Sequence, residues 1–366
     1  MKKLYITFIA IFLVIIVLPG VYILATPDRE FSDNENRVLQ TAPALNGDTL
    51  LDGSFQSKLS KYLSDQFPAR DLWTAVGTKI KLTLGFADIG GAYIGRDGYY
   101  MEKITSDDFE LDRYRENLAS IKSFIDAQGL PSTVVLVPAA GTVLSDKLPA
   151  NAQMYDARLM YGIAQDVFGD GVSLPDIYSA LSEHSGEYIY YRTDHHWTTM
   201  GAYLAYDCIM QGNGAYEGEL QKVSDSFLGT TYSKTLDSAA VPDAVYIAPV
   251  SDSIAVTADG KNIEVYDMSK LDTKDKYTVF FGGNRAMMLI KGGAQNGKTL
   301  LVIKDSFANS LAPFLTADYE NILMLDLRYF NGSVKNLVSS SGVTDIMFVG
   351  EMSNVAKDEN LFKLLF

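Results

Sequence analysis

LVIKDSF at residues 301–307 is the stretch that decides the fold, because a wholly apolar run ends there in three polar residues. The pattern predicts a buried strand over 300–303 that leads through Ser306 into a helix over 307–315. Wholly apolar strands that alternate with helices are typical of a parallel sheet that helices cover on both faces. We therefore expect an α/β fold with one mainly parallel sheet. Its further strands are expected at residues 133–137, 322–325 and 346–349.

A second stretch, YIYYRTDHHWT at residues 188–198, contains most of the histidine of the chain. Two of the three histidines stand there side by side, directly after Asp194. The composition of 188–191 favours a β-strand, and the spacing over 198–210 predicts a helix. In open α/β sheets, ligands bind beyond the carboxyl ends of the strands. We therefore expect this segment and Ser306 to meet at one edge of the sheet.

The order Asp194-His195-His196 distinguishes the two histidines. In an extended segment, residues i and i+2 point to the same face. Asp194 can then accept a hydrogen bond from Nδ1 of His196 and leave its Nε2 free as a base, whereas His195 is expected to point away. One alternative is a polar cluster that only closes a surface loop. Another is a metal site, but it would need further ligands, and we expect neither a metal nor a cofactor.

Ser306 is the candidate nucleophile. A residue between a buried strand and a helix lies where unpaired N–H groups and the helix dipole favour negative charge. That position suits an oxyanion on a substrate carbonyl. A serine is equally suited there to cap the helix. The catalytic interpretation gains weight because the chain also supplies a base, His196, and a carboxylate to orient it, Asp194.

The N-terminus predicts a membrane anchor over residues 1–27. Residues 4–25 are apolar and uncharged, and as a helix they would span roughly 33 Å. Lys2 and Lys3 precede this run, so the positive-inside rule places the rest of the chain outside the cytoplasm. A cleaved signal peptide is the alternative. The run is longer than the about 7–15 apolar residues of such a peptide, which favours an uncleaved anchor.

The rest of the chain divides into a membrane-proximal part and a catalytic part. Residues 28–110 predict a tether with short helices and a hairpin, and residues 111–366 predict the α/β domain. The net charge of −14 disfavours nucleic acid or an anionic membrane surface as a partner. The single Cys208 cannot form an internal disulfide, so the fold relies on its core. The segments expected are two helices over 55–84, a hairpin over 93–101, helices over 117–128 and 160–168, and β-like stretches at 244–247 and 277–281.

These motifs resemble those of a known family. YRTDHHWT at residues 191–198 resembles the signature of the DHHW family, whose members are exported, membrane-anchored proteins similar to the SGNH-like alginate O-acetylation proteins. The resemblance covers most of the chain. Its further pieces are NENR at 34–37, DQFPARD at 65–71, IGRDGY at 94–99, GGN at 282–284, KDSFANS at 304–310 and DLRYF at 326–330.

The resemblance implies an SGNH-hydrolase-like three-layer sandwich whose catalytic blocks are permuted, so that Asp-x-His precedes the serine. By motif position the implied triad is Asp194, His196 and Ser306. The implied reaction is acetyl transfer through an acyl-serine to a cell-surface or exported polysaccharide. A membrane-bound O-acyltransferase would supply the acetyl donor. The catalytic domain would lie outside the cytoplasm, held to the cell membrane by one N-terminal helix.

Three polar residues are candidates for supporting roles. Asn284 could supply an oxyanion donor, as Gly and Asn do in SGNH enzymes, although a simple turn is the alternative. Arg328 could hold an anionic or hydroxylated sugar, although a salt bridge to Asp326 is the alternative. Asn309 lies one helical turn after Ser306 and could orient that loop.

Aromatic residues near the motifs could form a platform for a sugar ring, and the candidates are Trp197, Tyr191 and Tyr329, with ordinary packing as the alternative. Two classes of function follow. One is an enzyme of acyl transfer, either an acetyltransferase, which is favoured, or a carbohydrate esterase; the two differ in whether sugar or water accepts the acyl group. The other is a non-catalytic SGNH-like protein that binds glycan or scaffolds an acetylation complex.

Overall fold

The chain forms two compact units in a computed structural model that describes residues 2–32, 34 and 37–365. Unit 1 comprises Met1–Phe86 with Ser233–Ala239, and unit 2 comprises Ala87–Tyr232 with Ala240–Phe366. The predicted hairpin is present as β4 (Ala92–Ile94) and β5 (Tyr100–Glu102). It belongs to unit 2, so the division differs from the boundary expected at residue 111. Residues 35–36 of the NENR motif lie outside the described residues.

A seven-stranded mixed sheet forms the centre of unit 2, with strand order β10-β9-β11-β13-β12-β14-β6. β12 pairs in parallel with β13 and with β14, and β14 pairs in parallel with β6. The prediction that these four apolar runs share one sheet is confirmed, and they pair in parallel, but the sheet as a whole is mixed rather than mainly parallel. The strands on the other side are antiparallel. The bounds are β6 (Ser132–Val137), β9 (Ala255–Ala258), β10 (Lys261–Ile263), β11 (Met287–Lys291), β12 (Thr299–Lys304), β13 (Asn321–Leu325) and β14 (Asp345–Glu351).

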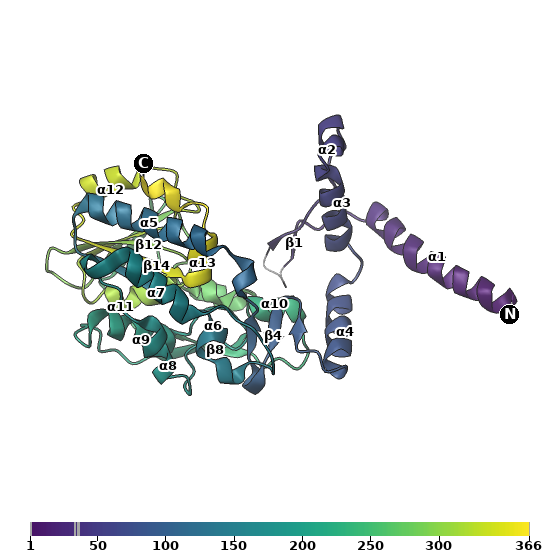
Figure 1. Cartoon of the computed structure of the whole chain (residues 1–366), viewed down its shortest axis with the longest axis horizontal. Coiled ribbons are helices and arrows are strands. Elements are labelled where there is room, and N and C mark those ends of the chain that lie inside the picture. The colour runs from purple at the N-terminus through teal and green to yellow at the C-terminus, as the bar shows by residue number, and fades with distance from the viewer. Residues whose placement is uncertain (1, 33, 35–36, 366) are drawn as a thin grey trace. The chain divides into compact units, whose positions relative to one another are not determined.

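Helices cover both faces of this sheet, so unit 2 has three layers (Figure 1). Successive strand residues point to opposite faces. Val302 accordingly packs with α8, α9 and α11, whereas Leu301 and Ile303 pack with α5, α7, α12 and α13. Burial on both faces explains why the strand is wholly apolar. The helices are α5 (Leu111–Gln128), α7 (Ala157–Phe168), α8 (Ile177–Glu183), α9 (Thr199–Met210), α11 (Ala308–Leu315), α12 (Val334–Ser341) and α13 (Met352–Lys357).

Two predicted strands are wrong. Residues 188–191 contribute only an isolated bridge between Tyr190 and Trp197, and residues 277–281 begin in the short 3₁₀ helix η6 (Lys276–Val279). Most aromatic side chains of both segments are buried, and several make edge contacts, such as Tyr191 against Phe227 with ring centroids 5.3 Å apart. Strand propensity reports how side chains fit a half-buried surface, and a packed loop satisfies the same preference. The Asp-His-His segment therefore does not leave a strand of the central sheet.

Outside the central sheet, the β-like stretch at 244–247 is a strand, β8 (Asp243–Ile247), which pairs with β7 (Gln221–Phe227). Helix α9 begins where the sequence predicts, because Thr198 caps it by accepting a hydrogen bond from the Gly201 N–H. This cap lies two residues after His196. It therefore fixes the position of the histidine segment relative to the helical layer.

Unit 1 begins with the apolar helix α1 (Lys2–Ala25). Its residues Lys3–Ala25 are long and apolar enough to cross a membrane. The unit also contains a two-stranded pair, β1 (Phe31–Ser32) and β2 (Arg37–Val38), and the short helix α2 (Gly47–Leu51). The two helices predicted over 55–84 are present, and they are interrupted at Phe67-Pro68. They are α3 (Ser54–Asp65) and α4 (Arg70–Thr83).

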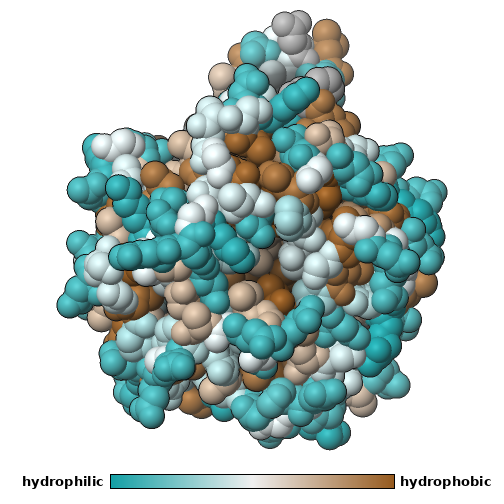
Figure 2. Space-filling view, turned by 90° about the vertical axis from the view of Figure 1, so that its left-hand side faces the viewer, coloured by the Kyte–Doolittle hydropathy of each residue, from teal (hydrophilic) through white to brown (hydrophobic). Residues whose placement is uncertain are grey.

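The face of the molecule in Figure 2 is typical of a water-exposed surface. Hydrophilic residues form most of its outline, and apolar residues lie between them toward the centre and the top. Folded proteins commonly expose apolar atoms in such a mixture. The mixture on this face therefore does not distinguish it from an ordinary water-exposed protein surface.

Candidate active site

Asp194, His196 and Ser306 form one hydrogen-bonded row. Nδ1 of His196 lies 2.6 Å from Oδ1 of Asp194, and Nε2 of the same ring lies 2.8 Å from Oγ of Ser306. A carboxylate only accepts hydrogen bonds, so Nδ1 carries the proton and Nε2 is left to accept the serine hydroxyl. The geometry is that of a nucleophile, a base and an acid that orients the base.

Asp194 is buried and fully hydrogen-bonded. Oδ2 accepts from the Thr230 N–H at 2.8 Å and from the Thr230 hydroxyl at 2.9 Å, and Oδ1 also accepts from the His196 backbone N–H. Burial alone would raise the pKa of Asp194, but the two imidazoles and these hydrogen bonds hold it well below its ordinary value. The carboxylate therefore stays ionised and keeps one orientation toward His196.

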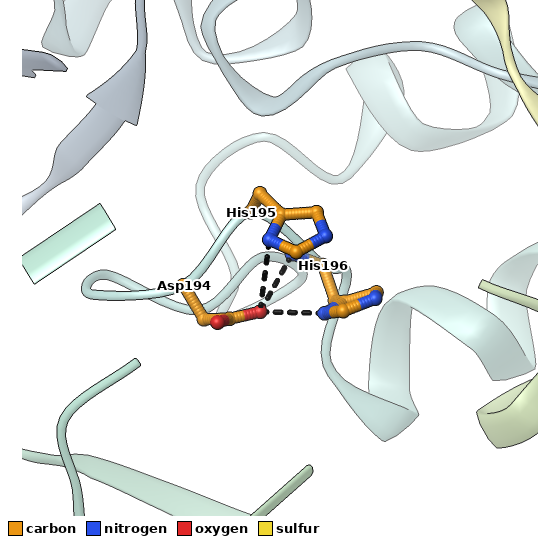
Figure 3. A group of neighbouring side chains, drawn as sticks. All are labelled: Asp194, His195 and His196. Carbon is orange, nitrogen blue, oxygen red and sulfur yellow. Dashed lines mark hydrogen bonds and ion pairs between the residues drawn. The ribbon is translucent and has the colours of Figure 1, made fainter. Parts of the chain in front are cut away.

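His195 does not point away from the row, so that prediction is wrong. Its ring packs against His196 with centroids 3.9 Å apart and planes 37° apart, and both rings lie beside Asp194 in Figure 3. The expectation assumed extended backbone, whereas residues 192–196 form consecutive bends. In a bent segment the side chains of neighbouring residues need not alternate between faces.

Counting protons identifies the tautomer of His195. Nδ1 of His195 lies 2.7 Å from Oγ1 of Thr230. The single hydroxyl proton of Thr230 is committed to Asp194, because two oxygens in contact without a proton would repel each other. Nδ1 of His195 must then donate to Thr230, which leaves Nε2 of His195 as an acceptor. The DHH motif thus carries two imidazoles that each donate toward the Asp194 end.

Gly229 makes room for Asp194. A Cβ added at Gly229 would lie 2.3 Å from Cβ and 2.5 Å from Oδ2 of Asp194, closer than real contacts allow. We expect Gly229→Ala to displace the carboxylate and to reduce acetyl-ester turnover by about 10²- to 10⁴-fold, the range lost when a catalytic base is misplaced. Gly162→Ala is the matched control, because nothing lies within 4 Å of a Cβ at that position. Equal turnover of the two variants, measured as kcat/KM, would contradict this role of Gly229.

Tyr277 forms a wall beside His196 that the sequence did not reveal. The two rings stack with centroids 3.8 Å and planes 7° apart. The Tyr277 hydroxyl lies 3.0 Å from the Ser306 carbonyl oxygen and 3.1 Å from Oγ of Ser310. Tyr277 therefore holds the imidazole from one side and the serine loop from the other.

The loop that carries Ser306 is fastened at both ends. Oδ1 of Asp305 accepts from the Phe307 N–H, and Oδ2 accepts from the Glu351 N–H and from Nδ2 of Asn354. On the other side, Nε1 of Trp197 donates to the Phe307 carbonyl. These contacts connect the serine loop to β14 and to the histidine segment, which fixes the spacing of Ser306 and His196.

Asn284 and Asn309 are joined through a buried cation, Lys304. Nζ of Lys304 lies 2.7 Å from Oδ1 of Asn309 and 3.1 Å from Oδ1 of Asn284, and Asn309 donates its own amide to Oδ1 of Asn284 at 3.0 Å. Burial lowers the pKa of Lys304 to about 8. Because its oxygen accepts two hydrogen bonds, Asn284 must turn its NH₂ group away from Lys304. The sequence singled out both asparagines but not the lysine.

Arg328 lies at the edge of a cavity of about 310 Å³ beside the serine loop, which Asp305, Asn354 and Lys357 also line. Its guanidinium forms a two-point ion pair with Asp326, at 2.9 Å and 2.6 Å. The salt bridge to Asp326 that the sequence suggested is therefore present. The hydrogen bonds to Asp326 raise the pKa of Arg328 further above its ordinary value.

The aromatic platform is wrong for two of its three predicted members. Trp197 and Tyr191 are fully buried and cannot present a face to a sugar. Trp197 instead donates a hydrogen bond to Oγ of Ser310 at 2.9 Å and packs against Phe307. Tyr329 is exposed, and the Arg328 guanidinium lies 5.6 Å above its ring.

The same histidine segment has the composition of a metal site, since possible ligand atoms of Asp194, His195 and His196 lie within 4.8 Å of one another. A structural zinc site takes four ligands, and a catalytic one takes three and a water. Here the Asp194 oxygens are already committed to Thr230 and His196. A metal would have to break those hydrogen bonds, so the donor set fits proton transfer better.

Comparison with protein families and curated proteins gives consistent results. Residues 149–325 match the family model described as DHHW protein. The probable alginate O-acetylase AlgJ of Pseudomonas syringae pv. tomato is 28% identical over 218 residues, which cover 56% of this chain and 51% of that protein. The corresponding protein of Pseudomonas fluorescens is 24% identical over 168 residues, which cover 43% and 42%. The chain thus spans about half the length of the curated relatives it matches.

Solved structures share the fold. A DHHW family protein from Eubacterium siraeum aligns with a TM-score of 0.63 at 23% identity, over 75% of this chain and 95% of that one. PatB1 of Bacillus cereus, solved with a sulfonyl adduct, aligns with a TM-score of 0.60 at 20% identity, over 73% and 96%. The resemblance drawn from the sequence motifs is therefore confirmed: residues 149–325, which contain Asp194, His196 and Ser306, are the part of the chain that matches the DHHW protein family.

Proposed function

We propose that the chain is an extracytoplasmic O-acetyltransferase that moves an acetyl group through an acyl-serine to a polysaccharide. The observation that carries this proposal is the row Asp194–His196–Ser306, in which the base lies 2.8 Å from the nucleophile. The relatives named as alginate O-acetylases support the acetyl group and the polysaccharide class. The SGNH-like sandwich that the motifs imply is part of the proposal, and the order of Asp194 and His196 before Ser306 along the chain supports its permuted arrangement.

The reaction would proceed in two balanced halves. Oγ of Ser306 attacks the acetyl carbonyl while Nε2 of His196 takes the hydroxyl proton, and Asp194 stabilises the imidazolium that forms. The donor alcohol then leaves with that proton, and an acetyl-serine remains. A sugar hydroxyl next attacks the acetyl-serine carbonyl and gives its proton to Nε2 of His196. The bond between the carbonyl carbon and Oγ then breaks, Oγ takes the proton back from the imidazolium, and the acetylated sugar leaves. Water in place of sugar would make the same chain an esterase.

Asn284 is proposed as the side-chain donor to the oxyanion. Its oxygen is engaged by Lys304 and Asn309, so its NH₂ group is the part that remains to donate. A donor that is fixed before the substrate binds costs no reorganisation when the negative charge develops. The proposal assigns Asn309 and Lys304 the task of holding Asn284, and it assigns Arg328 to the substrate cavity.

The proposed location follows from α1. As an uncleaved anchor, α1 would leave the rest of the chain outside the cytoplasm, where an exported or cell-surface polysaccharide is accessible. Acetyl donors made inside the cell must then cross the membrane. A membrane-bound O-acyltransferase that delivers the acetyl group is the partner that fits this arrangement.

The pH dependence of turnover should reflect the burial of His196. Burial, with His195 acting in the same direction, lowers the pKa of His196 to about 4, although Asp194 opposes the shift. The base works only when neutral, and a lowered pKa keeps it neutral in more acidic solution. We expect kcat/KM for p-nitrophenyl acetate to be flat between pH 7 and about 5.5 and to fall below that, whereas an unshifted histidine would halve the rate near 6.5. An acid limb centred at 6.5 or above would contradict this assignment.

Transferase and esterase are separated by the acceptor. The purified full chain is incubated with p-nitrophenyl acetate, with and without a series of oligosaccharide fragments of exported polysaccharides. The products are identified by mass spectrometry. A transferase yields acetylated oligosaccharide and releases nitrophenol faster when an acceptor is present. Acetate as the sole product with every acceptor would favour the esterase, and no release of nitrophenol above that of the Ser306→Ala variant would favour a scaffold.

A further inference from the structure

Helix α4 of unit 1 carries an exposed apolar arc. Leu72, Val76, Ile80 and Leu84 follow one another at intervals of four residues, and Trp73 lies beside them; Trp73 is 60% exposed and Leu84 69%. At about 100° per residue, these five side chains occupy an arc of about 120°. Such a stripe normally faces the core of a protein. Here it faces outward.

The opposite side of α4 is the one that unit 1 uses. Thr78 is the buried residue of the helix, and its hydroxyl donates to the carbonyl oxygen of Thr235 at 2.6 Å. Thr78 precedes Ile80 by two positions, which places it about 160° around the helix. The apolar arc is therefore not the packing face of α4 within its own unit.

Two lysines flank the arc. Lys79 and Lys81 precede and follow Ile80, so each lies about 100° from it on either side of the helix. Apolar residues with tryptophan on one face, bordered by lysines, are typical of helices that lie in a membrane interface. The two lysines stand in a chain whose net charge is −14, so they are a local basic feature that suits anionic lipid headgroups.

Hydrogen bonds hold the start of α4 close to the end of α1. Arg29 and Gln66 bond reciprocally, with the Arg29 N–H donating to Oε1 of Gln66 and Nε2 of Gln66 donating to the Arg29 carbonyl, each at 2.9 Å. The Tyr62 hydroxyl donates to Oδ1 of Asp28 at 2.9 Å. Arg29 follows Ala25 by four residues, which span at most about 14 Å. Since α4 begins four residues after Gln66, it lies within reach of any membrane that α1 crosses.

We propose that α4 lies in the headgroup region of the membrane that α1 spans, with its apolar arc inserted among the lipids. This inference rests on the proposed anchor but not on the proposed chemistry. Unit 1 would then be held to the bilayer at two places, one that crosses it and one that lies along it. Two attachments restrict tilting of the unit far more than a single flexible anchor does.

The tryptophans provide a direct test. The chain has two, and Trp197 is fully buried whereas Trp73 lies on the arc. The full chain, with α1 verified by intact mass, is reconstituted into phosphatidylcholine–phosphatidylglycerol vesicles with brominated acyl chains. The Trp73 emission is the difference between the wild-type chain and the Trp73→Phe variant, in which Trp197 alone emits.

The expected result is that the Trp73 emission is shifted to shorter wavelength, loses most of its intensity to brominated lipid, and is protected from aqueous iodide. Quenching by iodide but not by brominated lipid would mean that the arc faces water, and it would overturn the proposal. Protection from both quenchers would mean that protein covers the arc, which also overturns it. If the purified protein lacks α1 because α1 has been cleaved, the chain has no membrane anchor and the proposal is overturned. The acetyl-ester assay plays no part in this test.

Discussion

Replacing Ser306 by alanine should reduce acetyl-ester turnover by about 10⁴- to 10⁶-fold, as removal of the nucleophile does in other serine enzymes. The structural reason is that Oγ of Ser306 lies 2.8 Å from Nε2 of His196, which is the proton acceptor it needs. The measurement is kcat/KM for p-nitrophenyl acetate. The free energy of unfolding should change by less than about 1 kcal/mol, because the side chain gives up a single partly exposed hydrogen bond.

Ser339→Ala is the matched control for this loss. Ser339 is exposed on α12, and its hydroxyl bonds to the Lys335 carbonyl within the same helix. We expect this variant to keep its full activity. If Ser306→Ala retains more than about a tenth of the wild-type kcat/KM while it is folded, Ser306 is not the nucleophile, since alanine cannot form the acyl-enzyme intermediate. The scaffold interpretation would then take its place.

Replacing His196 by alanine should cause a loss of similar size, about 10³- to 10⁶-fold, because the serine loses its base and Asp194 loses the group it orients. The adjacent His195 provides the control within the same motif. Its Nδ1 bonds to Thr230 and lies 3.6 Å from Oδ1 of Asp194, but no contact joins His195 to Ser306, so His195→Ala should reduce kcat/KM by about tenfold or less. The two variants should be compared at pH 7, where the neutral imidazole predominates.

The comparison between the two histidines decides which of them is the base. Equal losses in His195→Ala and His196→Ala would contradict the assignment, because the structure gives only His196 a contact with Ser306. Loss of the folded state in either variant is detected by thermal unfolding. In that case, His196→Gln and His195→Gln retain a polar side chain and allow the same comparison.

The parallel part of the sheet was predictable because its strands are buried on both faces. In an apolar run such as residues 300–303, the side chains on both faces of the strand must be buried. A position between two helical layers provides this burial. The Asp194–His196 contact was predictable for a different reason. It joins residues two positions apart, so it depends on local geometry alone and survives even though the backbone there is bent.

The residues that surround this pair could not be predicted in the same way. Tyr277 and Thr230 are far from the Asp-His-His segment in sequence, and each contacts the site from a helix too short to leave a periodic pattern. From the sequence, a lysine at the end of a strand such as Lys304 is expected to be exposed to solvent. Only the fold shows that it is buried against two asparagines. The orientation of His195 depended on bends that strand propensity does not encode.

The strand predicted at residues 188–191 failed for an instructive reason. Its tyrosines are β-formers, but they serve the site as packing groups: Tyr190 donates to the Pro138 carbonyl, and Tyr191 packs against Tyr277. A segment can therefore carry strand-like composition because its side chains are buried in an aromatic cluster. In this chain that cluster supports the wall beside His196.

The most direct test of the central claim, that Ser306 is an activated nucleophile, is covalent labelling. The full chain is treated with phenylmethylsulfonyl fluoride at pH 7, a reagent that forms a sulfonyl ester with an activated serine, and the adduct is located by peptide mass mapping. The account predicts one adduct, on the peptide that contains Ser306, with loss of turnover in proportion to labelling, and no adduct in Ser306→Ala or His196→Ala. Unlabelled protein under conditions that inactivate a control serine esterase, or an adduct on another residue, would contradict it.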